Sequence, residues 1–581
     1  MKKFLAFINN ETKELIIQKE VSSIKSYHSN DVTILFNGHL LNTSTLSNLE
    51  FIAQTYNKEG IGFLKTLEGN FSLALYDNRE EKLFIAKDKV GVQPLYFTQT
   101  DKSFIFGTRL RDFSTLEGVE LTVNPNALAN YLQFGFVLQP NTIFQNCHKV
   151  NAGEYIAFNL KTTQYSRHTY WQLEACYSEE KTKQDETDIL QDAHKLLNTS
   201  IESNTQNPNY GVSLSGGYDS STLAAIAQAQ NSQKIDTFTI GFHDSKINEA
   251  PYAKEIAKHL GSNHHEHYFT AKDAVNLIPK MCIVYDEPFA DYASSPTMIT
   301  AQLLKANHID NLIAGDGGDE VFATAADLYT FERLKNTPYL LKQLFAQPLN
   351  YLPIDKVPYL KNYKNLPKKY NKLMQILLAK NIPQMIKTRN TLFLEKEFQR
   401  LIVDYNRPIE TSFDAINFQG SAECVDEIIG TYFKTTMADG ELVKSYSSMN
   451  HENIRLSTPY LNSKLIDYMA KVPSDIKVKN GIKKHILKEI AYQYIPKELI
   501  ERPKCGFDIP FSAWMRNELK DILYSQINKK RLDKDKLFYT STILTIRDKF
   551  YAGNDAYKYK LWRIFIFQLW YENFTSTTLK G

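Results

Sequence analysis

Ser213-Leu-Ser-Gly-Gly-Tyr-Asp-Ser-Ser221 is the stretch that decides the fold, because two glycines join a strand pattern to a helix pattern. The apolar run Tyr210 to Leu214 predicts a strand, and apolar residues with helical spacing predict a helix over Ser220 to Gln230. Glycines at such a junction let backbone N–H groups approach an anion, and the start of a helix favours negative charge. The stretch therefore predicts a phosphate-binding turn.

The side chains of this turn also suit a polyphosphate. Ser215 and Ser220 carry hydroxyl donors, and Asp219 offers a carboxylate to the Mg²⁺ that accompanies such a ligand. The turn is not a Walker loop, because no Gly-Lys-Ser/Thr follows the glycines, and it lacks the second glycine of a G-x-S-x-G nucleophile elbow. A plain Gly-Gly turn with a capped helix has the same composition, so both interpretations stay open on this stretch alone.

Strand and helix patterns alternate after this turn. Strands are predicted at 237–240, 267–269 and 311–314, and a helix at 250–260 is followed by Gly261. Such alternation is typical of an α/β fold with a doubly wound parallel sheet, which binds ligands at the carboxyl ends of its strands. From about residue 328 to residue 580 the pattern is mostly helical.

An acidic, glycine-rich loop follows the last of these strands. Gly315-Asp-Gly-Gly-Asp-Glu320 places three carboxylates among three glycines. Because the carboxyl ends of parallel strands meet at one edge of a sheet, we expect Asp219 and Asp319 to share a metal ion. Taken alone, an acidic turn before a helix is an equally good interpretation of the loop.

The first 175 residues have a different pattern. Short apolar runs such as 33–36, 71–76 and 83–86 are separated by turn residues, which predicts a layered antiparallel sheet. The polar, charged segment 177–186 suggests a linker. We therefore expect two domains, residues 1–176 and residues 187–581.

Composition excludes several classes of protein. The chain has 581 residues, 43% of them hydrophobic, and a formal charge of +3, which is too small to indicate nucleic acid or anionic lipid as a partner. No apolar run approaches the ~18–20 residues of a membrane span. Five scattered cysteines without a C-x-x-C pair suggest reduced thiols, so we expect a cytoplasmic protein. The cluster His264-His-Glu-His267 alternates faces along a strand and is a poor zinc chelate.

Taken together, these motifs resemble the asparagine synthetase family. The resemblance covers nearly the whole chain in order and implies an N-terminal Ntn-hydrolase-like αββα glutaminase domain, then an ATP-pyrophosphatase domain of the adenine nucleotide α-hydrolase type with a helical C-terminal part. Besides the two loops described above, the motifs that carry it are Phe36-Asn-Gly38, Leu67-Glu-Gly-Asn-Phe-Ser-Leu-Ala-Leu-Tyr-Asp77, Lys87-Asp-Lys-Val-Gly-Val-Gln-Pro-Leu-Tyr96, Asp286-Glu-Pro-Phe-Ala-Asp291, Leu442-Val-Lys444, Lys484-His-Ile-Leu-Lys488 and Arg502-Pro-Lys-Cys-Gly-Phe507.

The resemblance implies ATP and Mg²⁺ as cofactors. A substrate carboxylate would attack the α-phosphorus of ATP, pyrophosphate would leave, and ammonia or an amine would convert the acyl-adenylate to an amide. Lys484 matches the family lysine that stabilises the phosphates, and Lys444 adds positive charge nearby. The metal would lie on Asp219 and Asp319. The residues expected to cradle pyrophosphate are Ser215, Gly216, Gly217, Asp219 and Ser220.

Two departures from the family pattern bear on the substrates. Members that hydrolyse glutamine begin Met-Cys-Gly, whereas Lys2 stands here, so we expect a retained glutaminase fold without glutamine hydrolysis. Counting back from Pro459, Arg455 takes the place of an acidic residue near the adenylate, and Glu452 is a candidate substitute. The aspartate after Leu-Val-Lys-x is replaced by Tyr446.

Three functions fit this sequence. The first is an ATP-dependent ligase of the asparagine synthase type, acting on a small-molecule carboxylate with ammonia or an amine. The second is a specialised enzyme that amidates or cyclises a biosynthetic product, as β-lactam synthetases, lasso-peptide cyclases and enzymes that amidate uronic acids do. The third is a catalytically dead homologue that acts as a binding protein. No nucleic acid or membrane partner is expected, and the sequence leaves open whether the chain forms a homodimer.

Overall fold

The N-terminal part consists of two antiparallel sheets. The computed structural model describes residues 3–18, 25–42, 47–243, 248–324, 328–350, 366–502 and 509–578. The first sheet has the order β2-β1-β8-β7-β9, and the second has the order β11-β10-β6-β5-β4-β3. The strands are β1 (Leu5–Asn9), β2 (Leu15–Ile17), β3 (Lys25–His28), β4 (Val32–Leu40), β5 (Gly69–Asp77), β6 (Lys82–Lys87), β7 (Tyr96–Gln99), β8 (Ser103–Gly107), β9 (Cys147–Lys149), β10 (Glu154–Asn159) and β11 (Gln164–Thr169).

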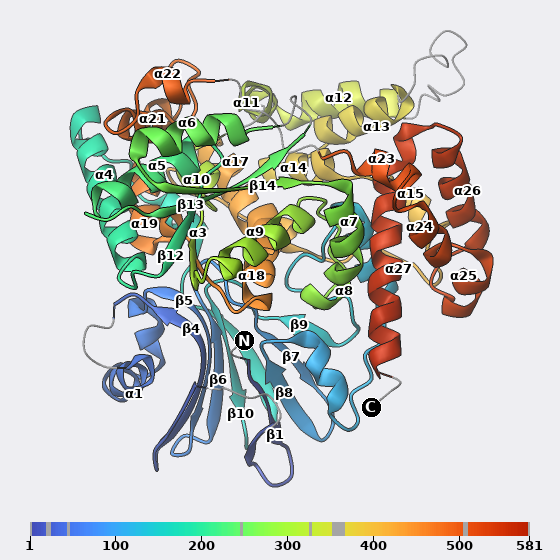
Figure 1. The fold of residues 1–581 in the computed structure, drawn as a ribbon. Coiled ribbons are helices and arrows are strands. Elements are labelled where there is room, and N and C mark those ends of the chain that lie inside the picture. The colour runs from blue at the N-terminus through green and yellow to red at the C-terminus, as the bar shows by residue number, and fades with distance from the viewer. Residues whose placement is uncertain are drawn as a thin grey trace.

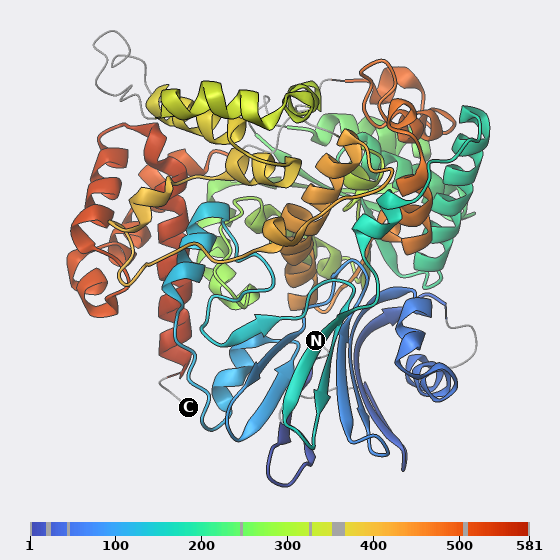
Figure 2. The same ribbon diagram turned by 180° about the vertical axis from the view of Figure 1, so that it is seen from behind.

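These two sheets form the inner layers of an α-β-β-α sandwich. Phenylalanine and aliphatic side chains such as Phe97 and Phe104 fill the space between the sheets, as expected for strands that alternate inward and outward residues. Helix α1 (Asn48–Glu59) covers the outer face of one sheet, and α2 (Pro125–Phe134) packs on the other (Figures 1 and 2). The layered arrangement expected from the sequence is confirmed.

The second part is built on a parallel sheet of order β14-β13-β12-β15-β16. Helices α4, α5 and α6 lie on one side of it, and α9 and α18 lie on the other, so the sheet is doubly wound (Figure 1). The strands are β12 (Tyr210–Ser213), β13 (Asp236–Phe242), β14 (Asn263–Phe269), β15 (Asn311–Ile313) and β16 (Arg455–Ser457). The helices are α4 (Glu186–Asn204), α5 (Tyr218–Ala229), α6 (Ala250–Leu260), α9 (Ser294–Ala306) and α18 (Leu442–His451).

The sequence patterns predict strands β12, β13, β14 and β15 but not β16, and they predict helices α5 and α6. Helix α6 has the predicted bounds, and Gly261 ends it in the left-handed region with φ +74. The expected linker begins later than predicted, because Tyr177 is buried in helix α3 (Leu173–Ser178) and Lys181 forms an ion pair with Asp426 at 2.6 Å.

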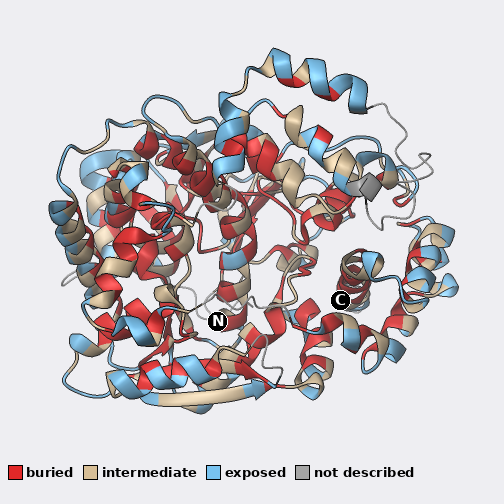
Figure 3. Ribbon diagram, turned by 90° about the horizontal axis from the view of Figure 1, so that it is seen from above, coloured by how far each residue is buried: buried red, intermediate tan, exposed pale blue. Residues whose placement is uncertain are grey.

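Helices make up the remainder of the chain. The last one, α27 (Lys558–Thr578), runs beside the N-terminal domain with Trp562 and Trp570 fully buried. Figure 3 shows that buried residues lie on the inward-facing sides of the helices. Within the described ranges, we find no helix that combines the length and apolar character needed to span a membrane.

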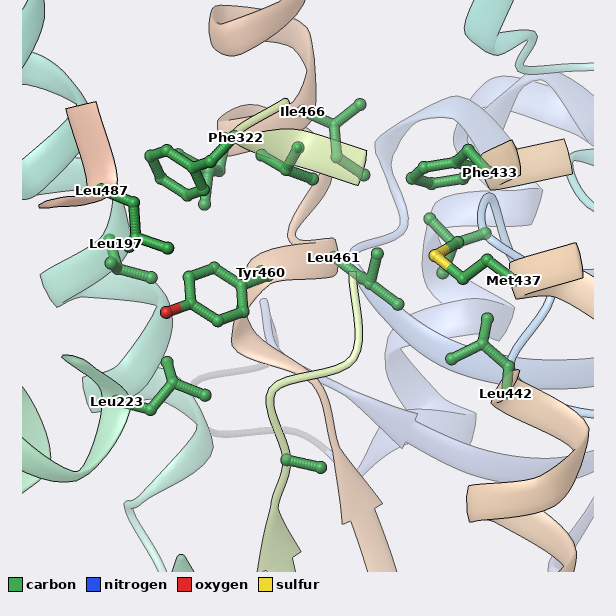
Figure 4. Close-up of a cluster of buried hydrophobic side chains, with 14 of the residues drawn as sticks. Leu197, Leu223, Phe322, Phe433, Met437, Leu442, Tyr460, Leu461, Ile466 and Leu487 are labelled. Atoms are coloured by element: carbon green, nitrogen blue, oxygen red, sulfur yellow. The ribbon is translucent and has the colours of Figure 1, made fainter. Parts of the chain in front are cut away.

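One hydrophobic cluster supports the carboxyl edge of the parallel sheet (Figure 4). Tyr460 is fully buried at its centre and donates a hydrogen bond to the backbone carbonyl of Asp219 at 2.8 Å. Leu461 packs against Gly317, which has φ +90 and where an added Cβ would lie 2.2 Å from Leu461 Cδ2. The packing of the core thus fixes the backbone of both loops predicted to bind the nucleotide.

Candidate active site

The turn between β12 and α5 is held by its own serines. The Ser215 amide donates to Ser220 Oγ at 2.9 Å, and the Gly217 amide donates to Ser215 Oγ at 3.2 Å. Gly216 has φ +76, and a Cβ there would lie 3.0 Å from the backbone nitrogen of Ala253. Backbone N–H groups at the start of α5 are therefore available to phosphate oxygens once the serine hydroxyls turn toward the ligand.

Asp219 and Asp319 converge on one cation, the ammonium of Lys484. The Lys484 Nζ lies 2.5 and 2.6 Å from the two Asp219 oxygens and 2.5 Å from Asp319 Oδ1. The Lys484 side chain is 10% exposed, whereas that of Asp319 is 40% exposed. Two carboxylates that reach one cation, with one of them open to solvent, form a donor set that fits a divalent metal as well.

The close approach of the two loops depends on glycine. A Cβ on Gly318 would lie 2.5 Å from Asp219 Oδ1, and one on Gly315 would lie 3.3 Å from Asp219 Cβ. Any side chain at Gly318 would thus displace the Asp219 carboxylate. The glycines of the acidic loop therefore bring Asp219 beside Asp319.

Lys484 is positioned by its backbone and charged by its neighbours. It has φ 56, in the left-handed region, directly before helix α21 (His485–Tyr492). Burial alone would lower the pKa of Lys484, but Asp219 and Asp319 outweigh burial and raise the pKa above its ordinary value. The side chain is thus a fixed cation at the carboxyl edge of the sheet.

Lys444 belongs to a neighbouring ionic cluster. Its Nζ lies 3.1 Å from Asp291 and 3.8 Å from Glu441. Burial opposes the charge of Lys444, but Asp291, Glu441 and Asp316 together raise its pKa. Lys444 is therefore joined to the Lys484 site through the loop that carries Asp316 and Asp319, although it contacts neither Asp219 nor Lys484 among the interactions of the described residues.

Asp316 and Glu320 are acids with raised pKa values. Burial, with the negative charge of Glu441, raises the pKa of Asp316 to about 6, and Ser445 donates to its Oδ1 at 3.0 Å. Burial, with Asp319 and Glu441, raises the pKa of Glu320 to about 8. Perturbed acids beside a cation cluster are typical of functional sites.

Arg502 adds a further cation that the sequence did not single out as a site residue. Its Nη2 donates to the backbone carbonyl of Ser215 at 3.1 Å and pairs with Glu249 at 2.9 Å. The motif position alone gives this contact no signal, and residues 503–508 of the same motif lie outside the described residues.

The expectation that Arg455 lies near the adenylate is wrong. Arg455 starts β16, pairs in register with Asn311 at the start of β15, and donates to its side chain at 3.0 Å. It therefore lies at the amino end of the sheet, opposite Asp319. Glu452 lies just before β16 and forms an ion pair with Lys305 at 2.7 Å, so it is not a substitute acid in the Lys484 site.

Histidines of the cluster on β14 contact nearby carboxylates. His265 lies 2.8 Å from Asp236, and His267 lies 3.2 Å from Asp273. In the portions of the chain that the structure describes, no group of three or more His, Cys, Asp or Glu side chains is arranged to hold a metal ion. Asp219 and Asp319 are a pair of carboxylates, one fewer than such a group contains.

Asn37 and Gly38, which belong to a motif of the family resemblance, make contacts within the protein. Asn37 donates to Gln93 Oε1 at 2.9 Å and lies 3.4 Å from the Tyr446 hydroxyl. Gly38 has φ +137, with no room for a Cβ beside the carbonyl of Asn70. A cavity of about 380 Å³ borders Asn37 and Gly38, and no cysteine is present among its described lining residues. Lys2 lies outside the described residues.

Comparison with known proteins gives two family matches. The model of the asparagine synthase family matches residues 193–572, and the model of the glutamine amidotransferase domain matches residues 26–171. The first match contains Asp219, Asp319, Lys444 and Lys484, and the second contains Asn37 and Gly38.

Curated relatives carry names consistent with these matches. Glutamine-hydrolyzing asparagine synthetase 1 of Bacillus subtilis (strain 168) is 22% identical over 584 residues, covering 94% of this chain and 86% of that protein. A Methanocaldococcus jannaschii relative with an asparagine synthetase name is 28% identical, covering 56% of this chain and 65% of that protein. Amidase chry2 of Gibberella zeae is 21% identical, covering 84% of this chain and 76% of that protein.

Proposed function

The chain belongs to the asparagine synthase family, and from that membership we propose that it is an ATP-dependent ligase that adenylates a carboxylate and transfers ammonia or an amine to it. Membership of the family supports an ATP-dependent amide-forming ligase. Adenylation of a carboxylate is supported by one observation, the convergence of Asp219, Asp319 and Lys484 at the carboxyl edge of the parallel sheet.

The turn at 213–221 would bind the β- and γ-phosphates of ATP as one leaving unit. Its N–H groups, the Ser215 and Ser220 hydroxyls and the start of α5 all favour negative charge. Gripping these two phosphates leaves the α-phosphorus open to attack by a carboxylate. Arg502 holds the carbonyl of Ser215 and so keeps the turn in this shape.

Asp219 and Asp319 would hold Mg²⁺, because both already reach a single cation. The metal would neutralise charge on the phosphates. Lys484 would then pair with phosphate oxygens instead of the carboxylates, since one pair of carboxylates cannot bind both cations at full strength. Lys484 would stabilise the charge that builds on the departing pyrophosphate.

Asp316 would accept the proton that the incoming amine must lose. Its pKa of about 6 lets it be ionised at neutral pH yet protonate readily during the reaction. Lys444 lies in the same cluster and keeps the local charge balanced. The acyl-adenylate would then have Lys484 on one side and Asp316 on the other.

We further propose that the N-terminal domain does not hydrolyse glutamine. Asn37 is engaged by Gln93, and the described lining of the adjoining cavity offers no thiol to attack an amide. The absence of glutamate release from glutamine by the purified protein is the test, and measurable release contradicts it. Lys2→Cys should not restore hydrolysis, because the Asn37 contacts remain.

The acceptor carboxylate distinguishes the ligase from its two alternatives. A specialised amidating or cyclising enzyme would release pyrophosphate only with its own biosynthetic acid, and a dead binding protein would release none with any acid. Retention of Lys484 between two carboxylates argues against the dead homologue, because such a buried cluster is costly to keep. Pyrophosphate release measured with ATP, ammonia and a panel of carboxylic acids, aspartate included, tests the proposal.

A further inference from the structure

A cavity of about 290 Å³ lies between the N-terminal domain and the helices of the C-terminal part. Lys87 and Tyr96 line it from the N-terminal sheets, Phe289 lines it from the segment before α9, and Asn450 lines it from α18. It has no residue in common with the Asp219–Asp319–Lys484 site. The cavity therefore requires its own explanation.

Most charged groups of this cavity already have partners. Asp286 pairs with Arg109 at 3.1 Å and with Arg111 at 3.4 Å. On the opposite wall, Lys149 lies 3.0 Å from Glu287 and 3.5 Å from Asp439. Asp286 thus has two arginine partners, whereas Glu287 and Asp439 share Lys149, and none of the three acids forms an ion pair with Lys87 or Lys3.

Lys87 is the exception. It ends β6, is only 9% exposed, and has no carboxylate within ion-pairing distance among the described residues. The adjacent Asp88 is not its partner, because the Asp88 carboxylate accepts hydrogen bonds from four backbone amides, those of Phe71, Gly91, Val92 and Gln93. Burial lowers the pKa of Lys87, and the attraction of Asp88 and Asp439 does not offset it.

Lys3 lines the same cavity and also lacks an ion-pair partner in the described part of the chain. Two lysines thus line one cavity without forming an ion pair with its acids. A buried cation without an ion-pair partner is costly, and an anion in the same space reduces that cost. An anionic ligand is therefore complementary to this cavity.

We propose that this cavity binds a small organic carboxylate, with its carboxyl group on Lys87. Aromatic walls from Tyr96, Phe136 and Phe289 suit a carbon skeleton better than an inorganic ion. Because the cavity takes residues from both domains, the ligand bridges them. This site is separate from the carboxylate that is adenylated, and it does not depend on the proposed ligase activity.

Calorimetric titration and thermal denaturation of the full chain, without ATP, test the site. The probes are succinate, butyrate and L-glutamate, with 1,4-butanediol as the uncharged counterpart of succinate and phosphate as the inorganic anion. At least one of the acids should bind and raise the melting temperature, whereas butanediol should not. Binding of phosphate alone, or no binding of any acid, overturns the proposal.

The variant Lys87→Met tests whether the acid binds in the cavity. The variant should bind the acid about tenfold more weakly or worse, because it loses a charged hydrogen-bond donor. Without ligand it should melt at the same or a higher temperature, since an uncompensated buried charge has been removed. Lys82→Met, on the same strand but paired at the surface with Glu80, should bind like the wild type. Unchanged affinity in Lys87→Met overturns the site.

Discussion

The ammonium of Lys484 lies 2.5 Å from a carboxylate oxygen of Asp219, although 265 positions separate the two residues in the chain. Asp219 lies in α5, just after the first strand of the parallel sheet, and Lys484 precedes helix α21 of the C-terminal part. Asp319 completes the contact from the fourth strand of the sheet. The proposed mechanism depends on these contacts between Lys484 and the two aspartates.

Lys484→Ala should slow turnover by about 10²-fold or more, the range found when one electrostatic stabiliser of a transition state is removed. ATP affinity should change much less, because the turn at 213–221 binds the phosphates independently. Steady-state kinetics of pyrophosphate release and calorimetry with ATP would separate the two effects. A loss of ATP affinity with kcat unchanged would show that Lys484 serves binding alone.

Asp219→Asn should weaken the binding of Mg²⁺, because one of the two metal carboxylates becomes a neutral amide. The concentration of Mg²⁺ that gives half-maximal rate should rise by about tenfold or more, since a charged ligand is replaced by a neutral one. Asp236→Asn is the control, because Asp236 begins β13 at the opposite edge of the sheet. A wild-type Mg²⁺ profile in Asp219→Asn would refute the metal assignment.

Gly318→Ala should reduce activity severely while leaving the fold intact. The new Cβ would lie 2.5 Å from Asp219 Oδ1 and push the carboxylate away from the metal position. Gly62→Ala is a matched control, because an added Cβ there meets nothing within 4 Å. Circular dichroism and the melting temperature monitor folding in both variants. Full activity in Gly318→Ala would mean that the two loops separate during the reaction.

Amide formation should decline as the pH falls through about 6, the pKa of Asp316. The sign follows from the raised pKa: below it the carboxyl group is protonated and cannot accept a proton from the amine, and above it the base is available. Asp316→Asn should remove this dependence and lower the rate at every pH. Rates measured from pH 5 to 8 with a large excess of amine, corrected for its ionisation, provide the check. An unchanged profile in Asp316→Asn assigns the titration to another group.

Local patterns predict much of this molecule. The turn at 213–221, the loop at 315–320 and helix α6 are each specified by residues close together in the chain, and the structure has them where the patterns place them. Their convergence at one edge follows from the rule for parallel strands.

The remainder depends on contacts between distant segments. Strand β16 has only three residues, too few for a periodic signal, and the position of Arg455 follows from the pairing of β16 with β15. The hydrogen bond of Ser445 to Asp316 and that of Arg502 to Ser215 join segments that no local pattern relates. Burial, which raises the pKa of Asp316, likewise depends on the folded environment.

The nucleotide products test the central proposal most directly. ATP should be split to AMP and pyrophosphate in the presence of ammonia and the correct carboxylate, because the turn at 213–221 has no Walker lysine at the β/γ junction and leaves the α-phosphorus open. Chromatography of the reaction mixture resolves AMP from ADP. Stoichiometric AMP is the predicted result, and stoichiometric ADP would contradict the account.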